Sequence, residues 1–380
     1  MSNTMKLVRL DFGRSPTHFG KNGIGLESTD ERVFSDTLFS AWVSTYARLY
    51  QEREAEKLPI ERLFEKFSTE KQPPFRLSST FVYRRQGDSF IDYLPMPVQR
   101  PLNYPSEPTK EMAIAKSFKV LRYLPLPIWQ RWYQGTGFTE QDYESISENA
   151  HEPKTKLHEL GETGTFDYSS AFNSYDLPKV AIDRTNRATN FYHTGLTQFG
   201  WQTAKESDDG TDQRAGLYFL VDFSSTEAAL ENRLKAALHL LGEEGIGGER
   251  SSGAGRFDVL SWEPAPPIWQ TVIAFESNRH SLISLYWDES VPESLLGEDA
   301  CYSLVERGGW IASSWSGRQL RRRKIHMFAE GSVFTDRPDG QLANVTPPEF
   351  ETSPGVYRPH PIYRSGIAFS LAIKAAPKAA

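Results

Sequence analysis

The chain has 380 residues, 38% hydrophobic and 13% aromatic, which is enough for two or three folded domains with well-formed cores. Its single cysteine, Cys301, excludes a disulfide framework and a cysteine-based zinc site, and indicates a reducing compartment. The formal net charge of -6 argues against a protein that binds long nucleic acids without selectivity, although local basic surfaces remain compatible with one bound RNA.

The sequence also argues against membrane association and against metal chemistry. Residues 1–6 lack the apolar core of a signal peptide, and no apolar run approaches the ~20 residues that span a bilayer. We therefore expect a cytoplasmic protein with no membrane partner. The histidines form no His-Glu-x-x-His motif, and Gly-x-Ser-x-Gly is absent, so the sequence predicts no metal site and no cofactor.

The first elements along the chain are a predicted strand, a helix and a hairpin. Residues 5–12 alternate apolar and polar side chains and lead into a turn around Gly13 and Pro16. After Asp30, five apolar residues share one helix face: Phe34, Leu38, Trp42, Tyr46 and Leu49. Residues 75–83 and 89–94 predict strands joined around Gly87. This order is the first half of a ferredoxin-like (RRM-like) unit with helices on one side of its sheet.

Residues 95–178 predict an insertion. Five prolines are spread over its first part, and the segment shows no clean hydrophobic periodicity. They are Pro95, Pro97, Pro101, Pro105 and Pro108. We expect irregular structure and short helices packed on the sheet. The insertion either contacts a neighbouring subunit or only decorates the fold.

Residues 179–193 predict a long hairpin, which we extend to about residue 200. Val180 and Ile182 lie on the outgoing strand, and the aromatic Phe191 and Tyr192 lie on the returning strand. The polar tip between them carries Arg184, Arg187 and Asn190. Without further information, a hairpin of this kind is a surface element with a solvated tip.

A glycine-rich loop at residues 242–256 separates a predicted helix from a predicted strand. Residues 217–223 form a buried strand, and Ser224 and Glu227 a capping box. Four leucines then share a helix face: Leu230, Leu234, Leu238 and Leu241. Gly242 stands where a left-handed residue would end this helix, and residues 256–262 alternate as another strand. These elements complete the first ferredoxin-like unit.

The composition of this loop is typical of a clamp for an RNA backbone. Glycines let amide groups approach a polyanion closely, and serines and arginines add donors for phosphate oxygens. The expected RNA-binding residues are Gly247, Gly248, Arg250, Ser251, Ser252, Gly253 and Arg256. A Walker-type loop is absent, and a dinucleotide loop would precede its helix. The alternative is a mobile surface connection.

Residues 264–267 read as a linker, so we predict domains at 1–262 and 268–380. In the second domain, strands are expected at 271–275, 281–287, 325–334 and 366–373, and a helix at 292–306, which together predict a second ferredoxin-like unit. Residues 318–324 contain five cations in seven positions, including Arg318, Arg321 and Arg322. Such a run is either a solvated surface or a surface that neutralises phosphates.

The segment from residue 245 to 257 resembles the glycine-rich signature of the RAMP superfamily of CRISPR proteins. Three further segments resemble the subunit that holds the 5′ tag of the guide RNA in type III (Csm-like, type III-A) effector complexes. They are residues 7–20 with Thr-His-Phe-Gly, residues 182–187 and residues 328–334. The resemblance spans most of the chain, although residues 51–176 contribute little.

The resemblance implies a non-catalytic subunit of an antiviral ribonucleoprotein. Its partners would be the 5′ tag of the guide RNA, the large polymerase-cyclase subunit, a RAMP backbone subunit, and target RNA near the hairpin. The hairpin would then be a thumb that inserts into the guide–target duplex and displaces a base pair, with Arg184, Arg187, Asn190 and Tyr192 contacting RNA. The subtype within type III stays open.

The turn after the first strand carries His18, Phe19 and Lys21, which the resemblance places near RNA. In relatives that process guide precursors, a histidine near this point can act as general base for attack by a 2′-hydroxyl. The alternative function is therefore a metal-independent endoribonuclease that matures guide RNA. Arg14 and Lys21 are candidates to stabilise the reacting phosphate only because they lie close to His18 in the sequence. We assign His18 to loop geometry and RNA contact, and predict no catalytic residue.

Overall fold

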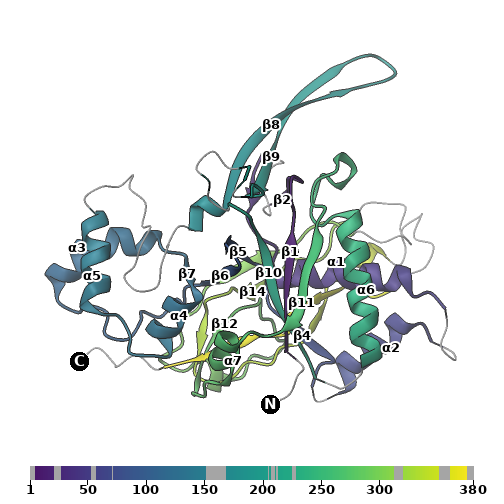
Figure 1. Cartoon of the computed structure of the whole chain (residues 1–380). Helices are drawn as coiled ribbons and strands as arrows, with labels where there is room; N and C mark the ends of the chain where they lie inside the picture. The colour runs from purple at the N-terminus through teal and green to yellow at the C-terminus, as the bar shows by residue number, and fades with distance from the viewer. Residues whose placement is uncertain are drawn as a thin grey trace.

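The structure is a computed structural model with an α+β fold, in which one large sheet is accompanied by small antiparallel sheets (Figure 1). It describes residues 5–20, 27–52, 57–70, 72–150, 168–203, 205–206, 210, 213–224, 228–311, 320–350 and 360–374. A long hairpin projects from the body, and the helices of the insertion lie on the opposite side of the body from α1, α2 and α6 (Figure 1).

One seven-stranded sheet organises the chain. Its path is β11-β1-β10-β5-β6-β7, and β4 pairs with β10 off this path. The strands are β1 (Met5–Asp11), β4 (Phe75–Leu77), β5 (Phe81–Gln86), β6 (Ser89–Pro95), β7 (Tyr123–Pro125), β10 (Ala215–Phe223) and β11 (Asp258–Pro264). Neighbouring strands are antiparallel. A helix follows β1 and another follows β10, so the order β11-β1-β10-β5 is that of a split βαβ unit.

The sheet is covered on both faces, not on one face as expected. Leu7 of β1 belongs to the core on one side, whereas Val8 belongs to the core on the other. Tyr218 and Phe219 of β10 divide between the two cores in the same way. Burial on both faces explains why β10 is a continuous apolar run and does not alternate.

Three helices cover the first face: α1 (Ser35–Leu49), α2 (Pro59–Thr69) and α6 (Ala228–Glu244). The indole of Trp42 donates a hydrogen bond to the carbonyl of Leu234 at 2.7 Å and so links α1 to α6. Leu49, expected on the buried face of α1, is 42% exposed. The helix α6 continues through Gly242, and the left-handed residue is Gly245 at φ 84°, which corrects the predicted helix end. Glu227 of the predicted capping box lies outside the described residues.

The second face packs against the insertion and the start of the C-terminal part. The insertion includes α3 (Pro108–Val120), α4 (Leu126–Tyr133) and α5 (Glu140–Ala150), in agreement with the expected short helices. Trp129, Trp132 and Trp269 are fully buried in this core. Arg9 pairs with Asp92 at 2.9 Å, and the indole of Trp269 donates to the same carboxylate at 2.8 Å. A buried charge is therefore neutralised inside this core.

The projecting hairpin consists of β8 (Phe172–Ile182) and β9 (Thr189–Phe199). It is longer than predicted, because its first strand begins at Phe172, within residues assigned to the insertion. Its pairs run without interruption from Phe172 with Phe199 to Ile182 with Thr189. Most side chains of β8 are exposed, whereas the second half of β9 is buried at the base of the hairpin.

The second ferredoxin-like unit expected in the C-terminal part is not confirmed. It starts with α7 (Pro267–Ala274) and continues with short strands in two- and three-stranded sheets. These strands are β12 (Arg279–Leu282), β13 (Leu304–Arg307), β14 (Ile325–Phe328), β15 (Val333–Phe334), β16 (Leu342–Asn344), β17 (Tyr363–Ser365) and β18 (Ser370–Ile373). The sheets have the orders β15-β12-β18, β13-β14 and β16-β17.

Two predictions for this part were wrong. The strand expected at 271–275 lies mostly in α7, where Pro267 starts the helix and Trp269 and Val272 are buried one turn apart. The helix expected at 292–306 is one short 3-10 turn, Glu293–Leu296, followed by β13. Between them, Cys301 forms a bridge to Val333, so long-range pairing takes the place of a local helix.

Candidate RNA-binding groove

The turn after β1 is held between the hairpin and the glycine-rich loop. His18 is only 4% exposed, and its Nδ1 donates a hydrogen bond to the carbonyl of Gly195 in β9 at 2.7 Å. Thr17 and Thr197 exchange two backbone hydrogen bonds of 2.8 Å. Phe19 lies in the short strand β2 (Phe19–Gly20), which pairs with β3 (Thr29–Asp30). These contacts hold the turn against the hairpin, and the ring of His18 is buried away from the surface.

The glycines of the loop permit close contact between two segments of the chain. At Gly247, with φ 98°, an added Cβ would lie 2.5 Å from the carbonyl oxygen of His18. At Gly248, an added Cβ would lie 2.6 Å from the imidazole of His18. The amide of Gly248 already donates to the His18 carbonyl at 2.9 Å, so this amide is occupied within the protein. These two glycines pack the loop onto the His18 turn.

The exposed part of the loop is a single 3-10 turn, Arg250–Ser252. Arg250, Ser251, Ser252 and Gly253 are all exposed. Arg256 is exposed as well, and its Nε donates to the carbonyl of Glu243 near the end of α6 at 3.0 Å. The hydroxyls and guanidinium groups, more than the glycine amides, are therefore the groups that the loop presents to a ligand.

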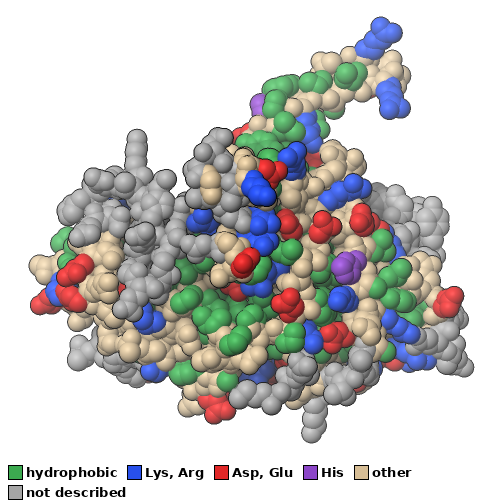
Figure 2. Space-filling model, in the orientation of Figure 1, with side chains coloured by type: hydrophobic (Ala, Val, Ile, Leu, Met, Phe, Trp, Pro, Cys, Tyr) green, Lys and Arg blue, Asp and Glu red, His purple; other side chains and the backbone are tan. Residues whose placement is uncertain are grey.

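The hairpin is tied to this loop through Lys179, in the outer half of β8, and its tip is exposed. Lys179 of β8 forms an ion pair with Glu249, and the hydrogen bond from Lys179 lowers the pKa of the Glu249 carboxyl. At the tip, Arg184, Arg187 and Asn190 are exposed, and Figure 2 shows Lys and Arg side chains there. Farther down the hairpin, Val180, Ile182 and Phe191 are exposed apolar residues, and Tyr192 is partly buried.

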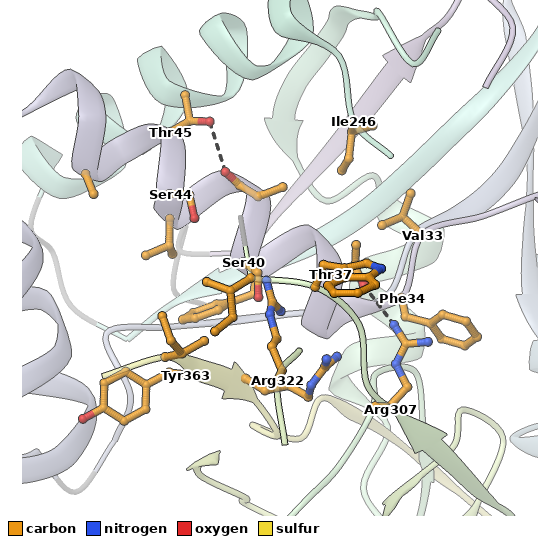
Figure 3. A pocket seen from close by; sticks show the side chains of 18 of the residues that line it. Val33, Phe34, Thr37, Ser40, Ser44, Thr45, Ile246, Arg307, Arg322 and Tyr363 are labelled. Atoms are coloured by element: carbon orange, nitrogen blue, oxygen red, sulfur yellow. Dashed lines mark hydrogen bonds between the residues drawn. The ribbon is translucent and has the colours of Figure 1, made fainter. Parts of the chain in front are cut away.

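A groove of about 1680 Å³ lies between the helices of the N-terminal part and the C-terminal part of the chain (Figure 3). One wall is formed by α1 and α2, and the other by residues 304–308, 310–311, 322 and 360–364. The glycine-rich loop contributes residues 245–248 and Arg250 to the same groove. The volume exceeds that of a typical small-molecule pocket, so the groove has room for several nucleotides.

The floor of the groove is a cluster of charged side chains around Asp36, which is fully buried in the first turn of α1. Arg307 donates two hydrogen bonds of 2.9 Å to this carboxylate and one of 2.9 Å to Thr37. Arg364 of β17 forms an ion pair with the same carboxylate. Nearby Arg322 also lines the groove. Burial lowers the pKa of Arg322, and repulsion from Arg307 lowers it further.

The structure separates the predicted RNA-binding residues into groups. Five of them line the groove together: Phe19, Gly247, Gly248, Arg250 and Arg322. Arg321, next to Arg322 in sequence, is exposed, and its guanidinium lies over the ring of Trp310 at 4.7 Å. The hairpin residues and Arg256 are not among the residues that line the groove. Lys21 and Arg318 lie outside the described residues.

Sequence reasoning missed the residues of the groove floor. Asp36, Arg307 and Arg364 come from α1, β13 and β17, and no local motif connects them. The sequence shows that Asp36 lies in the first turn of a helix, where a negative charge is favourable for the helix dipole. It does not show which arginines contact Asp36.

In the described part of the chain, neither a metal-ligand cluster nor a membrane-spanning helix is found. Within it, no group of three or more His, Cys, Asp or Glu side chains could hold a metal ion. Its helices are also too short or too polar to cross a bilayer.

Comparison with known proteins finds a matching family and several similar chains. Residues 276–373 match the family described as CRISPR Csm4 C-terminal domain. The chain is 29% identical to the CRISPR system Cms protein Csm4 of Mycobacterium tuberculosis strain H37Rv, over 90% of this chain and 91% of that protein. It is 24% identical to the protein of the same name from Methanocaldococcus jannaschii, over 88% of this chain and 86% of that protein.

The fold also resembles a solved structure, the Csm3-Csm4 subcomplex in the type III-A CRISPR-Cas interference complex. The TM-score is 0.58 at 16% identity, and the match covers 97% of this chain and 98% of the compared chain. Together, the family match over residues 276–373 and the relatives that align along nearly the full length make the chain similar to the Csm4 proteins of CRISPR systems.

Proposed function

We propose that the chain is a non-catalytic subunit of a type III CRISPR ribonucleoprotein and that its groove holds the 5′ tag of the guide RNA. The observation that supports this proposal best is the composition of the groove. Arg250 from the glycine-rich loop and Arg322 from the C-terminal part line one cavity, although they are far apart in sequence. A single RNA strand carries one negative charge per nucleotide, so a cavity with separated cations suits it.

The wall opposite the arginines is suited to an RNA strand as well. Thr37, Ser40 and Ser44 of α1 line the groove and carry hydroxyl groups on small side chains. Small residues let a sugar-phosphate backbone come close, and hydroxyls can exchange hydrogen bonds with 2′-hydroxyl groups. The groove thus offers both charge and polar contacts to single-stranded RNA.

The partners follow from the relatives. One relative of known structure is a Csm3-Csm4 subcomplex, and we propose that this chain likewise assembles with a RAMP backbone subunit. The large polymerase-cyclase subunit is the second proposed protein partner, and the cytoplasm the proposed location. We also interpret the sheet β11-β1-β10-β5 as the first ferredoxin-like unit.

The hairpin is proposed to act as a thumb on the guide–target duplex. Its tip presents Arg184 and Arg187 for backbone contact, and Phe191, 61% exposed, offers a flat apolar surface to a displaced base. Replacing residues 184–187 by a short Gly-Ser bridge preserves the pair between Ile182 and Thr189. In target-bound complexes, the displaced base should then become as protected from chemical probing as its paired neighbours, while tag binding stays unchanged.

Purification of the complex from its native host tests the proposed function. We expect one guide RNA with an intact repeat-derived 5′ tag, together with the backbone and large subunits. Recovery of the chain as a free monomer without RNA would contradict the proposal. Within the chain, Arg250→Ala should weaken tag binding about 10-fold, since a charge-assisted hydrogen bond contributes about 1.5 kcal/mol or more. The control Arg256→Ala, outside the groove, should weaken it less.

The alternative function, guide-RNA maturation, gains no supporting observation. His18 is buried and its Nδ1 is engaged by the hairpin, whereas a general base must reach the reacting hydroxyl. Incubation of the purified chain with repeat RNA in EDTA distinguishes the two functions. Intact RNA is expected, and a product ending in a 2′,3′-cyclic phosphate that is lost in His18→Ala would favour the endoribonuclease.

A further inference from the structure

The floor of the groove carries more positive than negative charge. Three guanidinium groups gather there, those of Arg307, Arg322 and Arg364, and Asp36 is the carboxylate that Arg307 and Arg364 share. Arg32, which also lines the groove, is neutralised separately by Glu330 at 3.0 Å. In direct ion pairs, three guanidinium groups therefore face one carboxylate, although Asp30 and Glu330 also attract Arg307 from farther away.

Arg322 is the member of the cluster without a partner. Among the described residues, no carboxylate lies within ion-pair distance of its guanidinium. Its Nε is buried and has no hydrogen-bond partner among the residues that the structure describes. Its backbone, by contrast, is fixed, since the amide donates to the carbonyl of Gly309 at 2.9 Å. A buried donor without an acceptor is unfavourable, so an anion that entered the groove would recover this free energy.

The surroundings of Arg322 leave room for such an anion. Arg322 and Arg307 lie on the C-terminal wall, facing the α1 residues Thr37 and Ser40, and Ile246 of the glycine-rich loop lies well apart from Arg322 (Figure 3). An RNA strand that contacts the glycine-rich loop near Ile246 could therefore reach Arg322 with another of its nucleotides. The loop and Arg322 would then hold different phosphates.

We propose that Arg322 binds a phosphate of single-stranded RNA at the floor of the groove, as a second site separate from the glycine-rich loop. This inference rests on the proposed function, because the RNA is the one that the groove is proposed to hold. The phosphate accepts hydrogen bonds from the guanidinium of Arg322 and balances positive charge of the arginine cluster that Asp36 does not neutralise. Arg321 takes no part, because it stacks on Trp310 at the surface.

The neighbouring arginines provide a matched pair of variants. Arg322→Gln and Arg321→Gln remove the same charge from adjacent positions of one segment, but only Arg322 lines the groove. We expect Arg322→Gln to raise the Kd of the full chain for a synthetic single-stranded tag RNA about 10-fold, and Arg321→Gln to raise it less than about 3-fold. In Arg322→Gln, the slope of log Kd against log salt should fall by about 0.7, the value for one phosphate contact on a single strand. Arg322→Lys should restore part of the affinity and most of the slope.

The phosphate can be internal or terminal, and RNAs with a 5′-hydroxyl and a 5′-phosphate distinguish these sources. A loss of affinity with both RNAs assigns Arg322 to an internal phosphate, and a loss only with the 5′-phosphate RNA assigns it to the terminal one. Equal affinity of Arg322→Gln and wild type for both RNAs overturns the site, while a loss in Arg250→Ala would still leave the proposed function intact. Failure of the wild-type chain and its complex to bind tag RNA would instead refute the proposed function. Thermal unfolding of each variant verifies that the fold is unchanged.

Discussion

Lys179 on the hairpin and Glu249 in the glycine-rich loop form an ion pair that joins the loop to the outer half of the hairpin. Both side chains are less than one fifth exposed, at 18% and 19%. Glu249 adopts a left-handed backbone conformation at φ 56°, which is uncommon for a residue other than glycine. The pair therefore fixes the direction of the hairpin relative to the loop, at the cost of an unfavourable backbone angle.

Breaking this pair should loosen the hairpin without unfolding the chain. We expect Lys179→Met and Glu249→Gln to be coupled by about 0.5–1 kcal/mol in a double-mutant cycle on the free energy of unfolding. Hydrogen exchange at the amides of β8 and β9 around Lys179 and Tyr192 should accelerate in both variants. Additive effects, with unchanged exchange, would show that the hairpin is held by its backbone pairs alone.

The glycines of the loop should differ widely in their tolerance of a methyl group. In Gly255→Ala, the added Cβ lies 2.0 Å from the carbonyl oxygen of Ile246, so we expect a loss of more than about 3 kcal/mol. Gly253→Ala is the control: its φ of 86° is similarly left-handed, but no atom lies within 4 Å of an added Cβ. That variant should lose only about 1 kcal/mol. Denaturant unfolding measures both, and equal losses would show that backbone strain, not contact, decides.

Asp36 should be the most sensitive residue of the groove floor. Asp36→Asn removes the one carboxylate that both Arg307 and Arg364 contact, which should cost about 3–5 kcal/mol of unfolding free energy. Arg364→Met should cost less, because Asp36 keeps its two hydrogen bonds from Arg307. Urea unfolding of both variants gives the order. A larger loss in Arg364→Met would contradict the excess of positive charge that we assign to the floor.

Glu31 should make the protein less stable at high pH. Burial, together with the neighbouring Asp30, raises the pKa of Glu31 from 4.5 to about 7, and Tyr168 donates a hydrogen bond to its carboxyl at 3.1 Å. The folded state therefore holds a proton that the unfolded state releases between about pH 4.5 and pH 7. In this window, the contribution of Glu31 to stability falls as the pH rises.

Glu31→Gln should remove this dependence. The variant should be about 1–3 kcal/mol more stable than wild type at pH 8, and the difference should disappear towards pH 4. Glu289→Gln, at an exposed position, should change stability by less than about 0.5 kcal/mol at either pH. Unfolding by denaturant at the two pH values is the measurement, and a variant that loses stability at pH 8 would contradict the assigned pKa.

The sequence predicted the elements whose signal is local. The strand at residues 5–12, the helix with Leu38, Trp42 and Tyr46 on one face, and the strand at 217–223 are all present, because alternation and helical spacing record which side of each element is buried. Predictions from short apolar runs were wrong where the same run is compatible with a helix and with a strand. Residues 271–275 are an example, since α7 was decided by packing of Trp269 and Val272.

The features of the candidate site likewise divide into those predicted from consecutive residues and those decided by tertiary contacts. The glycine-rich loop, the resemblance to the RAMP superfamily and the arginines at the hairpin tip were all readable from consecutive residues. The groove was not, because its floor joins Asp36 to Arg307 across 271 positions and to Arg364 across 328 positions. Local sequence does not predict which charged side chains come into contact after folding. Tertiary packing decides which buried charges have a counter-ion. For that reason the sequence alone could name Arg321 and Arg322 together, and only the fold places Arg322 in the groove and Arg321 on the surface.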